Sequence, residues 1–489
     1  MDTSIARRRD RCYVAGEWIE SGRSMPVSDL AAGGTFAEIE AAGPDQARSA
    51  LDAAAQCAPL LRETSVVERA RWCESIAEGI SDREEELAEV IVREAGKPIS
   101  SARGEVASAA ERFRRAAEEA RLLASKGEFR EGSTAGHEGW HAIVKPEPVG
   151  IVLCITPYNY PLATTALQVA PALAAGNSVV CKPASQTPVS GAILAEIIDE
   201  VDAIPVGAFN YVPGPAGEIG DVLSGDDRVD AIAMTGSSAA GKHVARQSGI
   251  VTLHLELGGN APAIVFEDAD LDDVATSCAA GSMKYAGQRC SAISRVLAQE
   301  SIHDELVDRL EAAIAAYEPG DLFDEETSFG PLISVGQAEW VEELVDDAVD
   351  RGATLVRGGS RRAPDGVPDE LEAQFFEPTL LAEVPHDARI LDEEQFGPVA
   401  AVTRVAGRED AIQLANRSDL ALDAAVFTAD YDRALEVADR VEAGSVRING
   451  PPSHGLGDIP FGGNDDSGIG REGLDASIHE LMRTKSIIL

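Results

Sequence analysis

Between residues 150 and 259 the chain alternates short apolar segments with helical ones, and this pattern constrains the fold more than any other feature. The apolar segments are predicted strands at 150–155, 178–182, 209–212, 231–234 and 251–257. The segments between them, at 162–175, 189–201, 218–224 and 239–248, have helical composition. Strands that alternate with helices form βαβ units and a parallel sheet, and such a sheet binds ligands at the carboxyl ends of its strands.

A second alternating block runs from Ala263 to about Asn449. Its predicted strands include 263–266, 295–298 and 424–427, and its predicted helices include 302–317 and 411–416. Two such blocks predict two α/β domains, joined near Gly258-Gly259, with a cleft between them. The preceding chain is predicted to form a hairpin at 13–19, helices over 43–94 and 101–125, and a protruding strand at 142–145.

Acidic residues outnumber basic ones by 83 to 42, which gives a net charge of −41 at pH 7. They are spread along the chain, as in 82–86 and 342–347, so they predict an acidic folded surface rather than an acidic tail. Such a surface repels nucleic acids and anionic membranes, so neither is a predicted partner. The acid excess and the scarcity of lysine also predict adaptation to molar salt, where repulsion between like charges is screened.

The seven cysteines predict reduced thiols and a cytoplasmic protein. They lie at positions 12, 57, 73, 154, 181, 278 and 290, an odd number with no C-x-x-C pair. Residues 1–12 lack the apolar stretch of a signal peptide, and no window approaches 18 uninterrupted apolar residues. No His/Cys cluster has the spacing of metal ligands, so no catalytic metal is predicted.

Two segments carry candidate reactive groups. Cys290 closes the segment Gly287–Cys290, in which glycine permits close approach of a ligand and Arg289 is expected to lower the pKa of the thiol. Glu256 lies between two leucines, and apolar surroundings make a carboxylate a better base near neutral pH. Alone, neither residue is specific, because an isolated cysteine is more often a small buried apolar side chain.

In their order along the chain, these segments resemble those of the aldehyde dehydrogenase superfamily over residues 12–489. The matching segments are Pro157–Pro161, Lys182–Pro188, Thr235–Gly241, Leu255–Pro262, Gly287–Ser291, Glu394–Pro398 and Pro460–Gly473. The resemblance implies that Cys290 attacks the aldehyde carbon and that Glu256 activates the water that hydrolyses the resulting thioester. It also implies that the Asn159 amide and the backbone N–H of Cys290 form an oxyanion hole. The stretch 467–473 is interpreted as structural.

The resemblance further implies a dinucleotide site. Its implied residues are Thr156, Pro157, Tyr158, Lys182, Ser185, Gly214, Gly236, Ser237, Gly241, Leu257, Glu394 and Phe396. In the family, the position of Ser185 is often glutamate in members that prefer NAD, because an acid binds the ribose hydroxyls and repels a 2′-phosphate. Serine here, with Lys182 nearby, predicts NADP, and NAD stays possible.

The implied reaction is NAD(P)-dependent oxidation of a small polar aliphatic aldehyde to its carboxylate, with Arg289 and Ser291 contacting the substrate. Several segments look like non-phosphorylating glyceraldehyde-3-phosphate, succinate-semialdehyde and lactaldehyde dehydrogenases. His454 stands where the phosphate-binding branch tends to carry arginine, which counts against a phosphorylated substrate. Two alternatives remain: a CoA-acylating semialdehyde dehydrogenase, which generally lacks the base glutamate, and a catalytically silent homologue.

The predicted fold class is therefore α/β, with three parts. Residues 1–127 and 147–257 form a Rossmann-like cofactor domain with a parallel sheet, and residues 258–462 form a second α/β domain that carries the nucleophile. Residues 128–146 and 463–489 form a small β arm. Members of the family commonly associate through such an arm, so a homodimer or homotetramer is expected.

Overall fold

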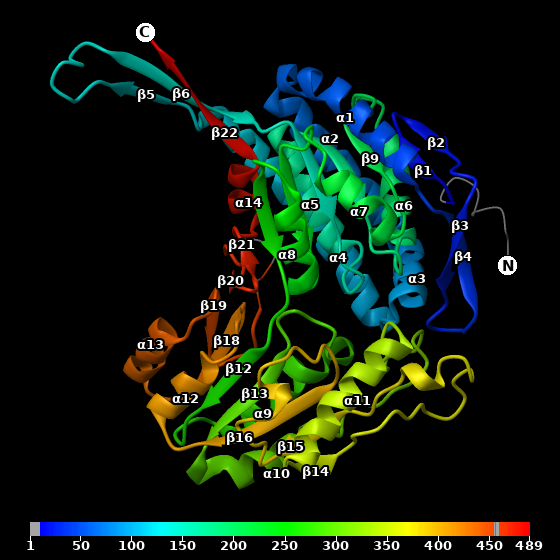
Figure 1. Cartoon of the computed structure of the whole chain (residues 1–489), viewed down its shortest axis with the longest axis vertical. Helices are drawn as coiled ribbons and strands as arrows, with labels where there is room; N and C mark the ends of the chain where they lie inside the picture. The colour runs from blue at the N-terminus through cyan, green and yellow to red at the C-terminus, as the bar shows by residue number, and fades with distance from the viewer. Residues whose placement is uncertain (1–9, 454, 456–458) are drawn as a thin grey trace.

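Two sheets, one in each lobe, organise the chain, and a narrow arm projects from the upper lobe (Figure 1). The structure is a computed structural model and describes residues 10–453, 455 and 459–489. Both lobes are α/β, and similarity to solved structures reported below confirms the predicted fold class.

The first sheet has eight strands in the order β2-β1-β9-β8-β7-β10-β11-β21. Their bounds are β2 Glu17–Ile19, β1 Cys12–Val14, β9 Phe209–Tyr211, β8 Ser178–Lys182, β7 Ile151–Ile155, β10 Ala231–Thr235, β11 Thr252–Glu256 and β21 Gly468–Ile469. The five strands from β9 to β11 are parallel, and they confirm the five strands predicted from the alternating pattern.

Helices cover both faces of this sheet. Ile151 and Leu153 of β7 pack into the core beneath α1 (Pro44–Glu63), α7 (Ala216–Ser224) and α8 (Ser238–Gln247). Val152 and Cys154 point to the opposite core, which is formed with α2 (Val66–Asp82), α3 (Glu84–Ala95), α4 (Ile99–Leu122), α5 (Ala163–Ala175) and α6 (Val189–Asp199). Because both faces are buried, β7 is apolar along its whole length, Ile151–Ile155.

The predicted helical stretch 43–94 is divided into three helices. Ser65 begins α2 with a capping box: its hydroxyl accepts a hydrogen bond from the N–H of Glu68 at 3.2 Å, and the Glu68 carboxylate accepts one from the N–H of Ser65 at 2.8 Å. Composition alone does not separate a capped break from a continuous helix.

The second sheet has seven strands in the order β14-β15-β16-β13-β12-β18-β19. Their bounds are β14 Thr354–Arg357, β15 Thr379–Ala382, β16 Val399–Val405, β13 Ile293–Gln299, β12 Ala261–Val265, β18 Asp423–Phe427 and β19 Ser445–Ile448. One face packs on α9 (Leu271–Met283) and α10 (His303–Ile314), and the other on α11 (Val335–Asp350), α12 (Arg408–Ala415) and α13 (Tyr431–Arg440). The remaining short elements are β3 Ser24–Ser28, β4 Thr35–Glu40, η1 Leu123–Ser125, η2 Lys284–Gly287, η3 Glu300–Ile302, η4 Glu372–Gln374 and η5 Arg389–Leu391.

The arm is a three-stranded sheet in the order β22-β6-β5, formed by β22 (Met482–Ile488), β6 (His141–Pro148) and β5 (Glu128–Glu131). The structure corrects the predicted extent of its second segment, 463–489. Residues 463–481 pack on the two lobes: β20 (Asn464–Asp465) pairs with β17 (Leu420–Ala421), β21 pairs with β11, and α14 (Leu474–Glu480) packs in the core of the upper lobe. The physical reason is the unpaired edge of β11, which accepts β21 as a partner strand.

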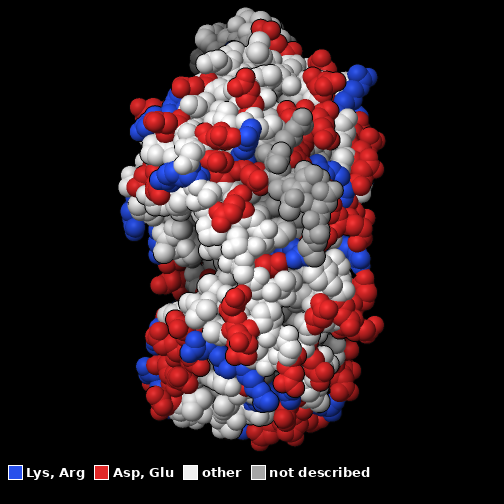
Figure 2. Space-filling view, turned by 90° about the vertical axis from the view of Figure 1, so that its right-hand side faces the viewer, with Lys and Arg blue, Asp and Glu red and all other residues white. Residues whose placement is uncertain are grey.

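Acidic side chains are spread over both lobes, with smaller groups of basic ones between them (Figure 2). Within the described ranges, none of the helices combines the length and the apolar character that crossing a bilayer requires.

Candidate active site

One cavity of about 800 Å³ collects most of the predicted site residues. Those that line it are Thr156, Pro157, Tyr158, Asn159, Lys182, Ser185, Gly236, Ser237, Glu256, Leu257, Arg289, Cys290, Ser291, Glu394 and Phe396. Some follow strands of the first sheet and others belong to the second lobe. The cavity therefore lies where residues far apart in the sequence, from 156 to 396, come together.

The register of the parallel strands explains this convergence on the upper-lobe side. Glu256, the last residue of β11, pairs with Thr235, the last residue of β10, and Ile155 of β7 pairs with both Met234 and Lys182. All four strands therefore end at the same edge, and the side chains just beyond them face one space.

The segment before Cys290 has an unusual backbone. Tyr285, Ala286 and Gly287 have φ angles of 55°, 51° and 70°, and the two non-glycine residues each cost about 1–2 kcal/mol in this conformation. Glycine is required at 287, because a Cβ atom there would lie 2.0 Å from the carbonyl oxygen of Gly397. The Tyr285 hydroxyl donates to the carbonyl of Ala95 at 2.6 Å and anchors the turn.

Asn159 lies beside the same segment. Its Nδ2 donates a hydrogen bond to the carbonyl oxygen of Gln288 at 2.9 Å, and the Gln288 side chain accepts one from the N–H of Ile333 at 2.9 Å. An amide carries two N–H hydrogens, so the second is available for another acceptor. The loop that follows β7 is thereby tied to the loop that carries the candidate nucleophile.

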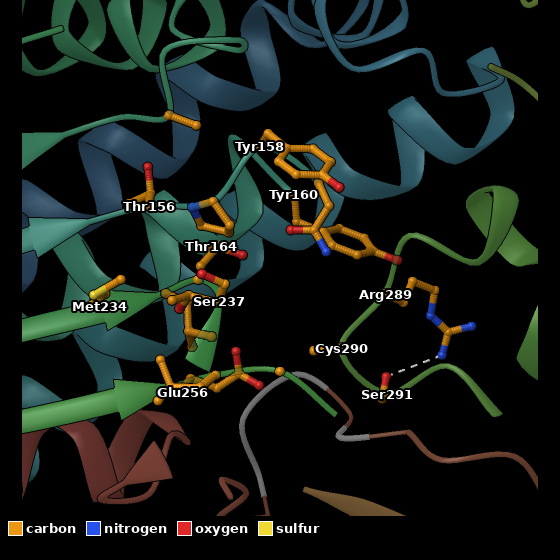
Figure 3. Close-up of a pocket in the computed structure, with 18 of the residues that line it drawn as sticks. Thr156, Tyr158, Tyr160, Thr164, Met234, Ser237, Glu256, Arg289, Cys290 and Ser291 are labelled. Atoms are coloured by element: carbon orange, nitrogen blue, oxygen red, sulfur yellow. Dashed lines mark hydrogen bonds between the residues drawn. The ribbon is translucent and has the colours of Figure 1, made fainter. Parts of the chain in front are cut away.

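Cys290 differs from the other cysteines. All seven thiols are free; six are buried, whereas Cys290 is partly exposed and lines the cavity. Burial within the protein raises the pKa of its thiol well above the usual value, and the negative charge of Glu256 raises it further. The expectation that Arg289 lowers this pKa is therefore wrong: its guanidinium extends toward Ser291 and donates to that hydroxyl at 3.3 Å (Figure 3).

Glu256 is directed into the cavity on the side of Cys290 (Figure 3). Burial raises the pKa of its carboxyl group well above the usual value, and the charge of Glu472 is the next largest cause, while a hydrogen bond with Cys290 acts in the opposite direction. Its Oε1 atom is buried with no hydrogen-bond partner among the described residues. A raised pKa makes the carboxylate a stronger base, which suits the general-base role that the sequence predicts.

The first turn of α8 fits a phosphate group. Ser237 begins the helix and its hydroxyl accepts from the N–H of Ala240 at 3.3 Å, while Gly236 precedes it at the cavity wall. The Ser238 hydroxyl is buried and has no partner within the described part of the chain. The Ser238 hydroxyl is not among the described groups that line the cavity, but the helix N-terminus at Gly236 and Ser237 fits the pyrophosphate of a dinucleotide.

Residues 182–185 present a cation and a hydroxyl to the cavity. The buried Lys182 ammonium donates to the carbonyl of Pro183 at 3.2 Å, and burial lowers its pKa to about 8. The Ser185 hydroxyl donates to the carbonyl of Gly214 at 3.2 Å. A nearby phosphate would favour the charged ammonium, and serine at 185 does not repel it.

Glu394 and Phe396 reach the cavity from the second lobe. The Glu394 carboxylate accepts from the N–H of Gly259 at 3.0 Å, and burial raises its pKa to about 7. Gly258 leaves room for it, since a Cβ there would lie 2.6 Å from Glu394 Oε2. The Phe396 ring packs edge-on against Tyr158, with ring centroids 5.9 Å apart.

Two predicted cofactor residues, Gly214 and Gly241, are not among the described residues that line the cavity. A Cβ at 241 would lie 2.4 Å from a methyl group of Leu257, and one at 214 would lie 2.7 Å from the carbonyl oxygen of Ala42. Both glycines therefore serve close packing behind the cavity wall.

Sequence reasoning missed several residues that line the cavity, among them Arg112, Tyr160, Lys284 and Glu472. Glu472 lies in the segment interpreted as structural, and its side chain is 4% exposed, 3.7 Å from His254. Its charge raises the pKa of Glu256, so this segment also contributes to the cavity. The only signal in the sequence was an acidic residue within a glycine-rich stretch.

Two further predictions concern residues elsewhere. His454 lies outside the described residues. Within the described ranges, His303, Asp304 and Glu383 are close enough together to hold a metal ion, but Arg404 donates to both carboxylates, to Asp304 at 2.6 Å and to Glu383 at 2.9 Å. None of the three lines the cavity, and the absence of a catalytic metal stays a prediction.

The chain is similar to known proteins over nearly its whole length. The model of the aldehyde dehydrogenase family matches residues 18–487. The NADP(+) succinate-semialdehyde dehydrogenase of Escherichia coli is 35% identical over 483 residues, covering 98% of this chain and 97% of that protein. The lactaldehyde dehydrogenase of Methanocaldococcus jannaschii is 34% identical over 480 residues, covering 98% and 99%.

Among solved structures, the NADP-dependent glyceraldehyde-3-phosphate dehydrogenase of Bacillus halodurans, complexed with NADP, superposes with a TM-score of 0.93. It is 34% identical, and the match covers 98% of each chain. With the family match over residues 18–487, these likenesses show that the chain belongs to the aldehyde dehydrogenase family.

Proposed function

We propose that this enzyme oxidises a short aldehyde that carries an anionic group, with NADP⁺ as the hydride acceptor. Membership of the family establishes the class of reaction, NAD(P)-dependent oxidation of an aldehyde. The balanced reaction is RCHO + NADP⁺ + H₂O → RCOO⁻ + NADPH + 2 H⁺. The observation that carries the proposal is the single cavity in which Cys290, Glu256 and two cations, Lys284 and Arg289, line one space.

The chain's own residues perform the following steps. The thiolate of Cys290, formed when its proton passes to solvent, forms a bond to the aldehyde carbon, whose carbonyl oxygen becomes negatively charged. The free amide hydrogen of Asn159 and the backbone N–H of Cys290 stabilise the negative oxygen, a contribution of about 3 kcal/mol for one such donor. The bound nicotinamide supplies the redox chemistry. Glu256 then deprotonates the water that hydrolyses the thioester on Cys290.

The preference for NADP is supported by the side chains beyond β8. The Lys182 ammonium and the Ser185 hydroxyl line the cavity; a 2′-phosphate is an acceptor for the ammonium, and the neutral serine does not repel it. Two of the similar proteins, from Escherichia coli and Bacillus halodurans, are named as NADP-dependent. We propose the same preference for this enzyme.

The anionic group is supported by cations at the aldehyde end. Lys284 and Arg289 line the cavity, and no ion pair joins either of them to an acid within the described ranges. Burial lowers the pKa of Lys284, and the neighbouring charge of Arg289 lowers it further, so an anion placed between them would be stabilised. Succinate semialdehyde and glyceraldehyde 3-phosphate, which appear in the names of two similar proteins, both carry an anionic group.

The test is a substrate panel. NADPH formation would be measured with succinate semialdehyde, glyceraldehyde 3-phosphate, lactaldehyde and butyraldehyde, with and without CoA. We expect a higher kcat/KM for the two anionic aldehydes and a carboxylate product without CoA. Dependence on CoA would identify the acylating class, no turnover would identify a silent homologue, and equal rates with butyraldehyde would reject an anionic substrate.

We propose that the arm joins subunits into a dimer or tetramer. Its strands carry apolar side chains at the surface, with Phe129 67% exposed and Ile488 63% exposed. Exposed apolar side chains that lie together are typical of a protein–protein interface. Replacing both with serine is expected to lower the molar mass measured by light scattering. A mass unchanged by the two substitutions would remove the arm from the interface.

We also propose a cytoplasmic enzyme that works at molar salt. A partly exposed Cys290 needs a reducing compartment, and the charge of −41 repels itself unless salt screens it. Thermal unfolding is expected at a higher Tm in molar salt than in dilute buffer. An equal or higher Tm in dilute buffer would reject the adaptation to salt.

A further inference from the structure

We propose that Arg112 holds the anionic end of the aldehyde and so determines which aldehydes the enzyme accepts. This inference rests on the proposed function and names the residue that binds the carboxylate or phosphate group of the substrate. Arg112 belongs to α4, far in sequence from the segments that carry the reactive groups, yet it lines the same cavity as Cys290.

The guanidinium of Arg112 is incompletely satisfied. One terminal N–H donates to the carbonyl oxygen of Ala163 at 3.1 Å. The Nε atom is buried and has no hydrogen-bond partner among the described residues, and no described acid forms an ion pair with the group. Burying a charged group without a counter-ion is unfavourable, so a ligand that supplies one gains from it.

Arg295 of the same molecule is an arginine whose guanidinium is fully satisfied by the backbone. Arg295 is fully buried, and its guanidinium donates to three backbone carbonyls: Asn260 at 2.8 Å, Leu414 at 3.1 Å and Ala415 at 3.1 Å. It does not line the cavity. Arg112 has one such bond and faces the space where the aldehyde must lie.

The two acids nearest to Arg112 are engaged elsewhere. Glu105 accepts from the N–H groups of Leu162 and Ala163 at 3.0 and 3.1 Å and pairs with Lys97. Glu472 lies 3.7 Å from the ring of His254. Their charges still reach Arg112, but neither carboxylate binds its guanidinium, so its fork stays open on the cavity side.

Tyr160 connects Arg112 to the reactive end of the cavity. Burial raises the pKa of the Tyr160 hydroxyl, while the charges of Arg289 and Arg112 lower it and that of Cys290 raises it. Tyr160 and these three groups line the same cavity, and Figure 3 shows Tyr160 in the part of it that holds Arg289 and Cys290. A guanidinium binds carboxylate or phosphate oxygens with two parallel hydrogen bonds, which suits it to grip one end of a short substrate.

The experiment compares R112Q and R112K with the wild-type enzyme on three substrates: succinate semialdehyde, glyceraldehyde 3-phosphate and butyraldehyde. For R112Q we expect KM for the favoured anionic aldehyde to rise about 10- to 100-fold, while kcat/KM for butyraldehyde changes less than about threefold. R112K keeps the positive charge but cannot form two parallel hydrogen bonds. Its KM for the anionic aldehyde should therefore lie between those of the wild-type enzyme and R112Q. The anionic aldehyde whose KM responds identifies the carboxylate or the phosphate as the group bound.

R121Q is the matched control, since Arg121 lies on the same helix and pairs with Glu74 at the surface. Equal losses for charged and uncharged aldehydes in both Arg112 variants would overturn the proposal, as would an unchanged KM for the anionic ones. If R112Q does not fold, the KM ratio of R112K decides alone. The substrate preference of the wild-type enzyme tests the proposed function separately, because the Arg112 proposal is read from ratios between variant and wild type.

Discussion

The two ends of the cavity are built differently. The proposed cofactor end is made of loops that follow parallel strands, with Ser185 and Ser237 just beyond β8 and β10 and Glu256 at the end of β11. The aldehyde end is made of single side chains from unrelated elements, with Arg112 on α4 and Lys284 in η2. Regular strands constrain the first end, and only the packing of separate elements constrains the second.

This difference separates the residues proposed to bind the cofactor from those proposed to select the aldehyde. Backbone groups and glycines at strand ends bind the parts of a cofactor that do not vary, and they leave contiguous motifs in the sequence. Side chains at the aldehyde end set the charge of that pocket, and each can change without disturbing the sheet. Substitutions at the two ends should therefore change different kinetic constants.

Cys290 stands where the two ends meet, and its removal should have the largest effect. C290A is expected to lower kcat by roughly 10⁴-fold or more, because the bond to the aldehyde carbon cannot form. Its Kd for NADP⁺, measured by fluorescence titration, should stay within about twofold. Turnover that survived C290A would remove Cys290 as the nucleophile, and a large loss of NADP⁺ affinity would show that the ends are not separable.

E256Q should affect hydrolysis more than formation of the thioester. We expect steady-state kcat to fall about 10²- to 10⁴-fold, because the water loses its base. A stopped-flow trace should still show a burst of NADPH close to one per active site. If the burst disappears with the steady-state rate, Glu256 is needed before hydrolysis as well.

At the cofactor end, S185E should change the cofactor preference alone. The new carboxylate repels a 2′-phosphate and accepts hydrogen bonds from ribose hydroxyls, so KM for NADP⁺ should rise roughly 10- to 100-fold and KM for NAD⁺ should fall. KM for the aldehyde is the internal control. A shift in that constant of similar size would place Ser185 outside a purely cofactor-binding role.

The pH dependence of Cys290 reports the contact between its thiol and Glu256. Burial and the Glu256 charge raise the thiol pKa above 9, so the rate of alkylation by iodoacetamide should still be rising at pH 9. E256Q removes the charge and should lower this pKa, which increases alkylation at pH 8 by about tenfold for a shift of one unit. Peptide mapping distinguishes Cys290 from the six buried thiols. A rate that levels off below pH 8 in the wild-type enzyme would contradict this arrangement.

The smallest effect is expected at the mouth of the aldehyde end. Neighbouring groups partly desolvate the Lys284 ammonium, but the residue as a whole is exposed, so solvent screens its charge and K284M should raise KM for an anionic aldehyde only about two- to fivefold. KM for NADP⁺ should not change. If K284M changed KM for NADP⁺ and not KM for the aldehyde, Lys284 would be assigned to the cofactor end of the cavity instead of the aldehyde end.

The sequence by itself determined the sheets and the reactive pair. Strands with a continuous apolar stretch, such as β7 and the middle of β8, are readable because a strand buried on both faces admits few other residues. Cys290 and Glu256 were singled out because their contiguous, glycine-containing segments resemble those of the aldehyde dehydrogenase superfamily. The fold explains one of these glycines, since a Cβ at Gly259 would lie 2.2 Å from the carbonyl of Cys290.

Only the tertiary structure decided the electrostatics and the aldehyde end. The sequence places Arg289 next to Cys290, yet the folded loop turns its guanidinium to Ser291, and burial raises the thiol pKa instead of lowering it. Glu472 and Arg112 reach the cavity from segments 360 residues apart, so no local pattern marks them. A pKa and a pocket depend on which charges lie within a few ångströms and how much water they exclude, and the fold alone sets those distances.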